Sequence, residues 1–307
     1  MFLDPTASAD SFTETLIEPK GRYRWGVTSE TGRLTDVLLS APANLEIVPC
    51  NAVSLSSAAN GLSCCTETAT RQHENMATLL QEAGVRCHFV PPAPGMPDLT
   101  FTRDAVVMSP WGLVTLRPAA RHRQAETEYV ADTLKALGIP SLGAVEEGTV
   151  EGGDVCIVRP GLVVIGYSGE RTTKAGARAL GRMFERFGWE VVYPCLDPHY
   201  LHLDTQFTML SSDWAVGCVE SLGDGFVDRM TGLGIDIVPA SREEVGRLGA
   251  NLLSLGLGSI IAPAGNDRLN RLLESIGFKI IEVDVDQFTR CGGGVHCLTM
   301  PLARHPD

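Results

Sequence analysis

The stretch EAGVRCHFV, from Glu82 to Val90, contains a pattern that recurs along the chain: a helical segment ends at a glycine, an apolar residue follows, and a short strand comes next. Glycine adopts the left-handed conformation that closes a helix without steric cost, so each instance has a local explanation. These glycines follow one another at similar intervals of roughly 40 to 55 residues, the length of a repeated supersecondary unit. The pattern returns in ALGIPSLGAV at Gly138, RFGWEVVYP at Gly188, GLGIDIVPA at Gly234 and SIGFKIIEVD at Gly277.

The segments between these glycines also resemble one another. Two short strands come first, such as DVCIV and LVVIG, and a helix follows, such as residues 173–187 or 267–276. Five near-equal units of strand, turn, strand, helix and strand predict an α/β fold with radial repetition, a five-bladed α/β-propeller with pseudo-fivefold ββαβ repeats. A doubly wound α/β sheet is the alternative, since helix, glycine and strand also recur there. No GxGxxG motif follows a strand, which disfavours nucleotide binding.

No linker or low-complexity run divides the chain, so we predict a single domain over residues 1–307, with residues 1–30 as an irregular arm. The run LTDVLLSA, residues 34–41, predicts a first strand, and residues 67–83 have helical spacing. Residues 43–61 between them are rich in turn-forming residues, and we interpret them as a mobile flap.

The composition is that of an acidic globular protein, with 44% hydrophobic residues and a net charge of −12. This charge argues against a nucleic-acid partner and suits a soluble cytoplasmic protein that acts on a cationic small molecule. No apolar run reaches about 18 residues and no basic-then-apolar leader is present, so we expect neither a membrane span nor a signal peptide. The nine cysteines include no CxxC pair, which indicates reduced thiols rather than a zinc ribbon or a disulfide framework. The oligomeric state stays open, a homo-oligomer included.

Polar residues gather in four short segments, which a radial repeat would bring to one central cavity. In the first, PDLTFTRD, Asp98 and Asp104 have the same parity, so both face one side if the segment is extended. A turn aspartate beside a surface Arg103–Asp104 ion pair is the alternative. In the second, VEGGDV, the carboxylate of Glu151 can orient a histidine, bind a cation, or only cap a Gly-Gly turn.

In the third segment, LHLDTQF, His202 and Asp204 alternate with apolar residues and would share one face of a strand. A histidine can act as acid and base in turn, although a metal ligand and a structural histidine are alternatives. In the fourth, CGGGVHCLTMP, Cys297 follows a glycine-rich turn, which suits either a presented nucleophile or a buried core thiol. His296 is adjacent, but neighbours in an extended segment point to opposite faces, so His202 is the better candidate base.

Four carboxylates are more than a histidine needs for its orientation. A pocket with several carboxylates and a thiol suits a planar cation with several N–H donors, such as a guanidinium, which forms paired bonds to carboxylates. Such a cation would also favour the thiolate form of the cysteine, since a nearby positive charge lowers a thiol pKa.

These segments resemble the guanidine-modifying, or pentein, superfamily, whose members include arginine deiminases, dimethylarginine dimethylaminohydrolases and amidinotransferases. The resemblance runs from about Pro97 to Leu302 and implies the five-bladed propeller that the repeat predicts independently. The matching stretches are PDLTFTRD, TLRPAARHRQAETE, GTVEGGDV, IGYSGERT, LHLDTQFT, IIAPAG and CGGGVHCLTMPL.

The resemblance implies a catalytic role for three residues and no metal or organic cofactor. Cys297 would attack the guanidinium carbon and form a covalent amidino-thioether. His202 would protonate the departing amine and then activate water, and Glu151 would orient His202.

The resemblance also implies five substrate-binding residues. Asp104 and Asp204 would hold the guanidinium nitrogens, and Asp98 would lie near the substrate. Arg117 and Arg171 would grip the carboxylate of the amino acid.

The segments FTRD and HLDT look like arginine deiminases, whereas Pro97-Asp98 and the short chain look like dimethylaminohydrolases. Dimethylaminohydrolases usually carry lysine where Asp204 stands. We therefore predict a hydrolase that cleaves a guanidine C–N bond of L-arginine or an N-substituted arginine, giving citrulline and ammonia or an amine. An amidinotransferase, which passes the amidino group to an amine, and a catalytically idle binding protein are the alternatives.

Overall fold

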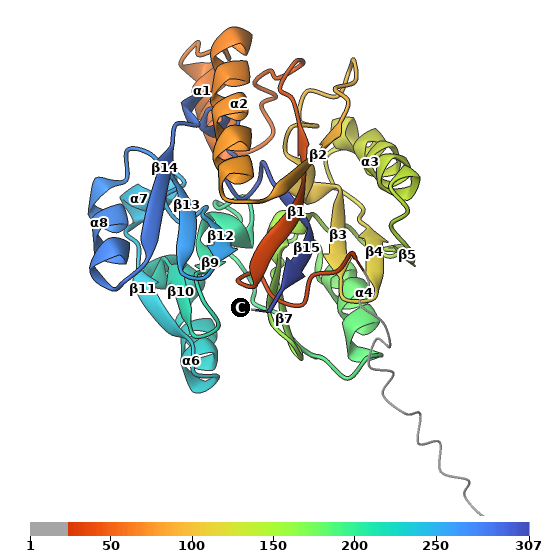
Figure 1. Cartoon of the computed structure of the whole chain (residues 1–307), viewed down its shortest axis with the longest axis vertical. Helices are drawn as coiled ribbons and strands as arrows, with labels where there is room; N and C mark the ends of the chain where they lie inside the picture. Colours follow the sequence, from red (N-terminus) through yellow and green to blue (C-terminus); the bar gives the residue numbers. More distant parts are fainter. Residues whose placement is uncertain (1–23, 307) are drawn as a thin grey trace, which may run out of the picture.

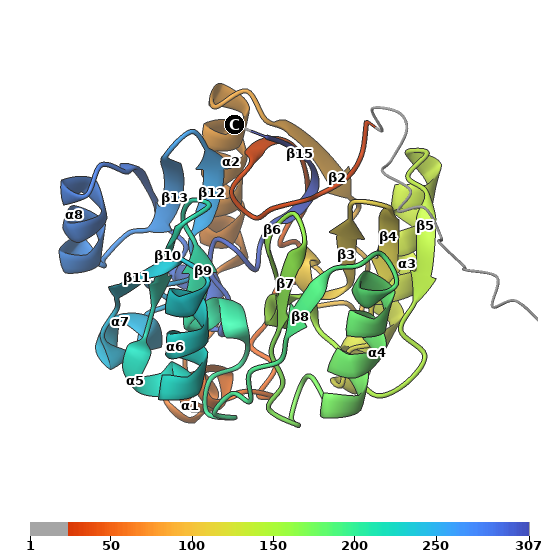
Figure 2. The ribbon, with the colours of Figure 1, turned by 90° about the horizontal axis from the view of Figure 1, so that it is seen from below.

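The computed structural model describes residues 24–306, and these residues contain five three-stranded sheets. Most of the predicted irregular arm, residues 1–23, lies outside the described residues. Its described part, residues 24–30, has bends and one isolated bridge between Gly26 and Ala303. Figures 1 and 2 show the sheets following one another around the molecule, with the longer helices on the outside.

Four repeated units, each of one sheet and its helices, follow the order that the sequence predicts. In each sheet the first two strands are antiparallel and the third is parallel to the second. The first comprises β3 (Val106–Ser109), β4 (Gly112–Thr115), α3 (Gln124–Ala136) and β5 (Ser141–Ala144). The second comprises β6 (Val155–Arg159), β7 (Leu162–Ile165), α4 (Lys174–Glu185) and β8 (Glu190–Val192). The third comprises β9 (Phe207–Met209), β10 (Trp214–Gly217), α5 (Val219–Leu222), α6 (Asp224–Gly232) and β11 (Asp236–Pro239). The fourth comprises α7 (Arg242–Gly246), β12 (Leu253–Gly256), β13 (Ser259–Pro263), α8 (Asp267–Ser275) and β14 (Lys279–Val283).

The fifth sheet joins the two ends of the described chain. Its middle strand β1 pairs in parallel with β2 and antiparallel with β15, where Leu38 lies opposite Met300. Its elements, with the short helix that precedes β15, are β1 (Arg33–Ser40), α1 (Ala52–Ala59), α2 (Thr66–Glu82), β2 (Arg86–Val90), α9 (Asp286–Thr289) and β15 (Met300–His305). The residues expected to form a turn-rich flap therefore contain a helix, α1, because Asn51 caps its first turn and Ser54 completes a capping box.

The glycines of the repeat have the predicted backbone conformation. All five have positive φ, from 75° at Gly188 to 106° at Gly277. A Cβ atom at Gly84 would meet no atom within 4 Å, so the glycine is needed there for its φ angle rather than for space. The pattern thus marks each point where a helix ends and the third strand begins.

Three single 3₁₀ turns precede the first strands of three sheets, and each contains an aspartate. These turns are η1 (Thr102–Asp104), η3 (Gly152–Asp154) and η4 (Leu203–Thr205), while a fourth, η2 (Arg121–Arg123), leads into α3. Two of the aspartates bond to the next turn along the chain: Gly153 N donates to Asp104 Oδ1 at 3.0 Å, and Leu203 N donates to Asp154 Oδ1 at 2.9 Å. These bonds join neighbouring sheets at the ends where the 3₁₀ turns lie.

The core lies between the sheets and the helices outside them. Val37 and Leu38 of β1 are fully buried, and so are Leu180 of α4 and Leu269 of α8. Within residues 24–306, no helix has the length and apolar character needed to cross a membrane.

Candidate active site

One small cavity collects most of the residues that the sequence predicts to be functional. Its lining includes Asp98, Asp104, Arg171, His202 and Cys297. These side chains come from η1 and the segment before it, from the segments before α4 and η4, and from the turn before β15. The cavity has a volume of about 20 Å³, which is room for roughly one water molecule.

Glu151 and His202 form a buried acid–base pair behind this cavity. His202 Nε2 lies 2.9 Å from Glu151 Oε2, and Arg171 Nη1 lies 3.0 Å from the same oxygen. Ala119 N donates to the other carboxylate oxygen of Glu151 at 3.0 Å. Burial works against a charged Glu151, but its bond to His202 and the Arg171 guanidinium hold its pKa well below the usual range.

His202 is positively charged at neutral pH. Burial opposes the charge, but the carboxylates of Asp104, Asp154 and Glu151 outweigh it and raise the pKa of His202 to about 10. Its other ring nitrogen, Nδ1, has no hydrogen-bond partner among the described residues and lies 3.8 Å from Asp104 Oδ1. A Cβ atom at Gly153 would lie 2.6 Å from this nitrogen, so only glycine allows the ring to pack here.

Arg123 is a buried residue of the site whose role the sequence did not reveal. Its Nη1 donates to Asp104 Oδ2 at 2.5 Å, its Nε donates to Glu126 Oε2 at 2.9 Å, and its Nη2 reaches the carbonyl of Phe101 at 3.0 Å. The signal in the sequence was the Arg-x-x-Glu spacing of Arg123 and Glu126 at the start of α3. Arg123 holds the Asp104 carboxylate in place at the cavity wall.

Cys297 is 2% exposed, and its sulfur lies 3.4 Å from Asp204 Oδ2. Asn251 Nδ2 donates to the same sulfur at 3.2 Å, while Asn251 Oδ1 accepts from His296 N at 3.0 Å. Burial, followed by the charges of Asp204 and Asp104, raises the pKa of the Cys297 thiol well above its usual range. Without a bound cation the thiol is therefore protonated, and Asn251 is a second site residue that the sequence alone did not reveal.

Asp204 connects Cys297 to a second buried histidine. Its Oδ2 lies 2.8 Å from His296 Nδ1, while its Oδ1 has no partner among the described residues. Burial opposes ionisation of Asp204, but its bond to His296 lowers the pKa of the carboxyl. The imidazole of His296 reaches Glu30 at 3.5 Å, and Glu30 is paired with Arg103 at 3.2 Å.

The parity arguments for these segments were wrong, because the segments are turns rather than strands. His296 and Cys297 are neighbours in a turn, and both side chains reach the same oxygen of Asp204. His202 and Asp204 flank the start of η4 and point to different partners, Glu151 and His296. His202 lines the cavity and His296 does not, while the role of His202 as the base stays a prediction.

The remaining predicted residues divide between the cavity and the surface. Asp98 Oδ2 lies 2.7 Å from His122 Nε2 at the cavity wall. Arg171 Nη2 donates to the Cys50 carbonyl at 3.1 Å. Arg117, by contrast, is exposed, and its Nη1 donates to the carbonyl of Glu146 at 2.7 Å. The structure does not bring Arg117 into the cavity.

Among residues 24–306, two groups of three side chains have ligand atoms within 4.8 Å of one another, as a metal site requires. They are Asp104, Glu151 and His202, and Cys50, Asp98 and His122. The guanidinium groups of Arg123 and Arg171 already neutralise carboxylates of the first group, and Arg171 Nη2 lies 3.2 Å from the sulfur of Cys50 in the second. These positive charges disfavour a divalent cation and leave an organic cation as the better fit.

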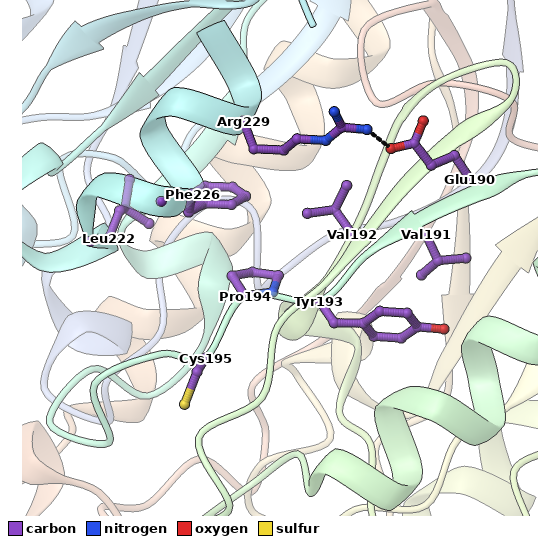
Figure 3. A pocket seen from close by; sticks show the side chains of 11 residues that line it. Glu190, Val191, Val192, Tyr193, Pro194, Cys195, Leu222, Phe226 and Arg229 are labelled. Carbon is purple, nitrogen blue, oxygen red and sulfur yellow. Dashed lines mark hydrogen bonds and ion pairs between the residues drawn. The ribbon is translucent and has the colours of Figure 1, made fainter. Parts of the chain in front are cut away.

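A much larger cavity, of about 590 Å³, lies between β8 and α6 (Figure 3). Valine, tyrosine, proline, leucine and phenylalanine side chains line most of it, and its rim carries an ion pair between Arg229 and Glu190. Its thiol, Cys195, has no histidine beside it in the lining. The small cavity at Cys297 is therefore the candidate active site, because the Cys297 thiol, the His202 imidazole and the carboxylate of Asp104 line it together.

The protein thus combines a mixed α/β fold of small sheets with a site that contains one thiol and several carboxylates. Residues 46–304 match the family model described as eukaryotic N,N dimethylarginine dimethylhydrolase, and the chain belongs to this family. It also lies within the guanidine-modifying superfamily to which its sequence motifs pointed.

Relatives and solved structures agree with this assignment. The N(G),N(G)-dimethylarginine dimethylaminohydrolase of Pseudomonas aeruginosa is 28% identical over 76% of this chain and 87% of its own. An arginine deiminase of Mycobacterium marinum is 31% identical over 69% of this chain and 61% of its own length. The structure of a mutant of the Pseudomonas aeruginosa enzyme complexed with citrulline superimposes with a TM-score of 0.73 at 25% identity, covering 87% of this chain and 99% of that one.

Proposed function

We propose that this protein hydrolyses a C–N bond in the guanidinium group of arginine or an N-substituted arginine, giving citrulline and ammonia or an amine. One observation carries the proposal: the Cys297 thiol and the His202 imidazole line one cavity with the carboxylates of Asp98 and Asp104. The family assignment and the relatives named for such reactions support it.

The substrate cation activates its own nucleophile. Burial, together with the charges of Asp204 and Asp104, raises the pKa of the Cys297 thiol well above its usual range. A guanidinium bound between these carboxylates neutralises their charge, so the thiol loses its proton to solvent as the substrate binds. Paired bonds to the carboxylates also concentrate positive charge on the carbon that the sulfur attacks.

His202 then takes part in two proton transfers, first as the donor and later as the acceptor. Sulfur attacks the guanidinium carbon, and protonated His202 gives its proton to the departing nitrogen, which leaves as the neutral amine. The carbon stays bound to Cys297 as a cationic amidino-thioether. Neutral His202 next takes a proton from water, and hydroxide attacks the carbon. The tetrahedral carbon then expels the sulfur, and the proton of its hydroxyl group passes to that sulfur, which leaves the neutral ureido product and the Cys297 thiol. Glu151 holds the ring through the 2.9 Å contact during both transfers.

The second carboxylate beside the sulfur bears on the choice of substrate. The carboxylate of Asp204 contacts Cys297 Sγ through Oδ2. Its other oxygen, Oδ1, has no partner among the described residues. A carboxylate at this position accepts bonds from an NH₂ group but gains nothing from a dimethylated nitrogen. We therefore propose that the unsubstituted terminal nitrogen of arginine is preferred over the dimethylated one.

Substrate entry requires movement of the cavity wall, because about 20 Å³ is too small for a guanidinium. Cys50 and Asn51 form part of this wall, and Asn51 Nδ2 donates to the Cys291 carbonyl at 2.9 Å. We propose that the segment around Asn51 opens, which retains the predicted flap although it contains α1.

Two further parts of the proposal concern the whole molecule. We propose that the five sheets form a closed five-bladed propeller within a single domain, since the ββαβ unit recurs in four of them. The nine cysteines are free thiols, which is typical of a reducing compartment, and we propose a cytoplasmic location.

The test is incubation of the purified protein with arginine, monomethylarginine and asymmetric dimethylarginine, followed by a colorimetric assay for ureido product. We expect citrulline without any acceptor amine, and an adduct on Cys297 in mass spectra of quenched reactions. Ornithine that accumulates only when an acceptor amine is added would show an amidinotransferase instead. No product from any of the three guanidines would contradict the proposal.

A further inference from the structure

Two cysteines outside the proposed chemistry lie in contact although they are 227 residues apart in the sequence. The sulfur atoms of Cys64 and Cys291 are 3.5 Å apart. Cys64 belongs to the loop between α1 and α2, and Cys291 begins the glycine-rich turn that carries Cys297. Cys291 also lines the candidate active site.

Hydrogen bonds on both sides of Cys64 hold this loop against the turn. Cys65 N donates to Gln287 Oε1 at 2.8 Å, and Arg290 Nη1 donates to the Ser63 carbonyl at 2.8 Å. The contact between the two sulfurs is therefore part of a docked loop rather than a chance approach of two free side chains.

The two thiols differ in access and in ease of ionisation. Cys64 is half-buried, whereas Cys291 is 7% exposed. The hydrogen bond from Cys291 lowers the pKa of Cys64, with a smaller contribution from Arg290, although burial opposes it. The same bond, together with burial, raises the pKa of Cys291. The more accessible sulfur, that of Cys64, is therefore the easier of the two to ionise, and the Cys291 thiol lies in contact with it.

We infer that Cys64 and Cys291 are an oxidation site that a hydroperoxide converts to a reversible disulfide. The Cys64 thiolate attacks the peroxide oxygen and becomes a sulfenic acid, while the peroxide is reduced and releases hydroxide or alkoxide. Cys291 then loses its proton and attacks the sulfenic sulfur, which forms the S–S bond and releases hydroxide, so the two thiols lose two electrons to the peroxide in total. A dithiol reductant reverses the reaction.

The disulfide would disturb the active site through the backbone of Cys291. A bonded pair of sulfurs lies at about 2.05 Å, so the two segments must approach each other. The carbonyl of Cys291 accepts from Asn51, and the next two glycines have no space to spare: a Cβ atom at Gly293 would lie 2.2 Å from Phe101. Displacement of about 1 Å in a catalytic site can cost roughly 100-fold in rate, so we expect oxidation to lower kcat/KM by about 10- to 100-fold.

The experiment treats the reduced full-length protein with a small excess of hydrogen peroxide, removes the peroxide, and blocks remaining thiols with N-ethylmaleimide. We expect an intact mass lower by two hydrogen atoms before alkylation, two fewer alkylated thiols, and a cross-linked peptide pair containing Cys64 and Cys291. Dithiothreitol should restore nine alkylated thiols. This readout does not depend on the proposed activity, so failure of that activity would leave it intact.

Two variants separate this site from unspecific oxidation. Cys64→Ser should abolish the cross-link, the mass loss and the peroxide-induced fall in activity, with unchanged activity before treatment. Cys65→Ser is the matched control, since Cys65 is adjacent and exposed, and it should behave as the parent protein. A cross-link of Cys64 to Cys65, a cross-link of Cys291 to Cys50, or single overoxidised cysteines without any Cys64–Cys291 bond would each overturn the inference.

Discussion

The turns η3 and η4 occupy equivalent places before the first strands of neighbouring sheets, yet their aspartates do different work. Asp154 in η3 accepts a backbone N–H from the next turn, at Leu203, and thereby joins two sheets. Asp204 in η4 makes no such bond with its carboxylate, which lies against His296 and Cys297 instead. The same turn therefore joins sheets through Asp154 and brings Asp204 to the thiol, where we propose that it takes part in the chemistry.

This division predicts that the largest effects on turnover come from the residues that contact the cavity beside η4. Cys297→Ser should abolish product formation and the covalent adduct, because a neutral hydroxyl is far harder to ionise than a thiol. His202→Ala should lower kcat by about 10²- to 10⁴-fold, the usual cost of removing an acid–base group. Both are measured by the citrulline assay together with a thermal melt.

Cys195→Ser is the matched control for the thiol, since Cys195 is exposed in the larger cavity between β8 and α6 (Figure 3). It should retain full activity. A fall in activity equal to that of Cys297→Ser would place the chemistry in the larger cavity and contradict the assignment of the site.

The two aspartates themselves provide the sharpest test. Asp204→Asn should lower kcat/KM by about 10²- to 10³-fold, the cost of removing one electrostatic group at a reacting centre, with little change in melting temperature. Asp154→Ala should instead lower the free energy of unfolding by about 1–3 kcal/mol, because the buried Leu203 N–H loses its acceptor. Denaturant titrations and steady-state kinetics on both variants separate the two effects. Equal losses of activity and stability in both variants would remove the distinction between the turns.

The charge of His202 predicts a pH dependence of stability. Its pKa is raised from 6.5 to about 10 in the folded protein. The stabilisation is therefore fully present below about pH 6.5, the unfolded value, and is lost as pH rises through about 10. Relative to His202→Gln, the parent protein should lose free energy of unfolding on the order of a few kcal/mol between these pH values.

Urea titrations at pH 6, 8 and 9.5 measure this difference. His199→Gln is the control, since His199 is exposed, and it should follow the parent curve at each pH. A parent-to-His202→Gln difference that does not change with pH would show that His202 is neutral in the folded protein.

The smallest effect concerns the two arginines expected to grip the substrate carboxylate. Arg171→Ala should raise KM and also lower kcat, since Arg171 contacts Glu151 at the cavity. Arg117→Ala should change KM less than about threefold, because the side chain is exposed and bonds to a carbonyl away from the cavity. A large rise in KM for Arg117→Ala would show that the substrate draws Arg117 into the site.

By itself, the sequence predicted the repeated order of strands and helices outside α1, and its resemblance to a known superfamily named the residues that we propose as the site. The glycine after each helix is a local requirement for positive φ, which is why Gly84 and its four counterparts predicted the repeat correctly. Cys297, His202 and Glu151 lie in short motifs that resemble those of the superfamily, and this resemblance is what predicts their roles. Local rules of this kind can be applied without knowing where the rest of the chain lies.

Only the tertiary structure decided which side chains meet. The sequence analysis expected Asp98 and Asp104, and likewise His202 and Asp204, to face one side. That expectation holds only for an extended backbone, and these segments contain 3₁₀ turns instead. Arg123, Asn251 and Glu30 come from segments far from Cys297 in sequence, so no local pattern could show that they meet around it. Arg117 is the opposite case. It lies in a motif that resembles the superfamily, yet its side chain faces solvent rather than the cavity. Side-chain direction depends on turn geometry and on packing between sheets, and these are properties of the whole fold.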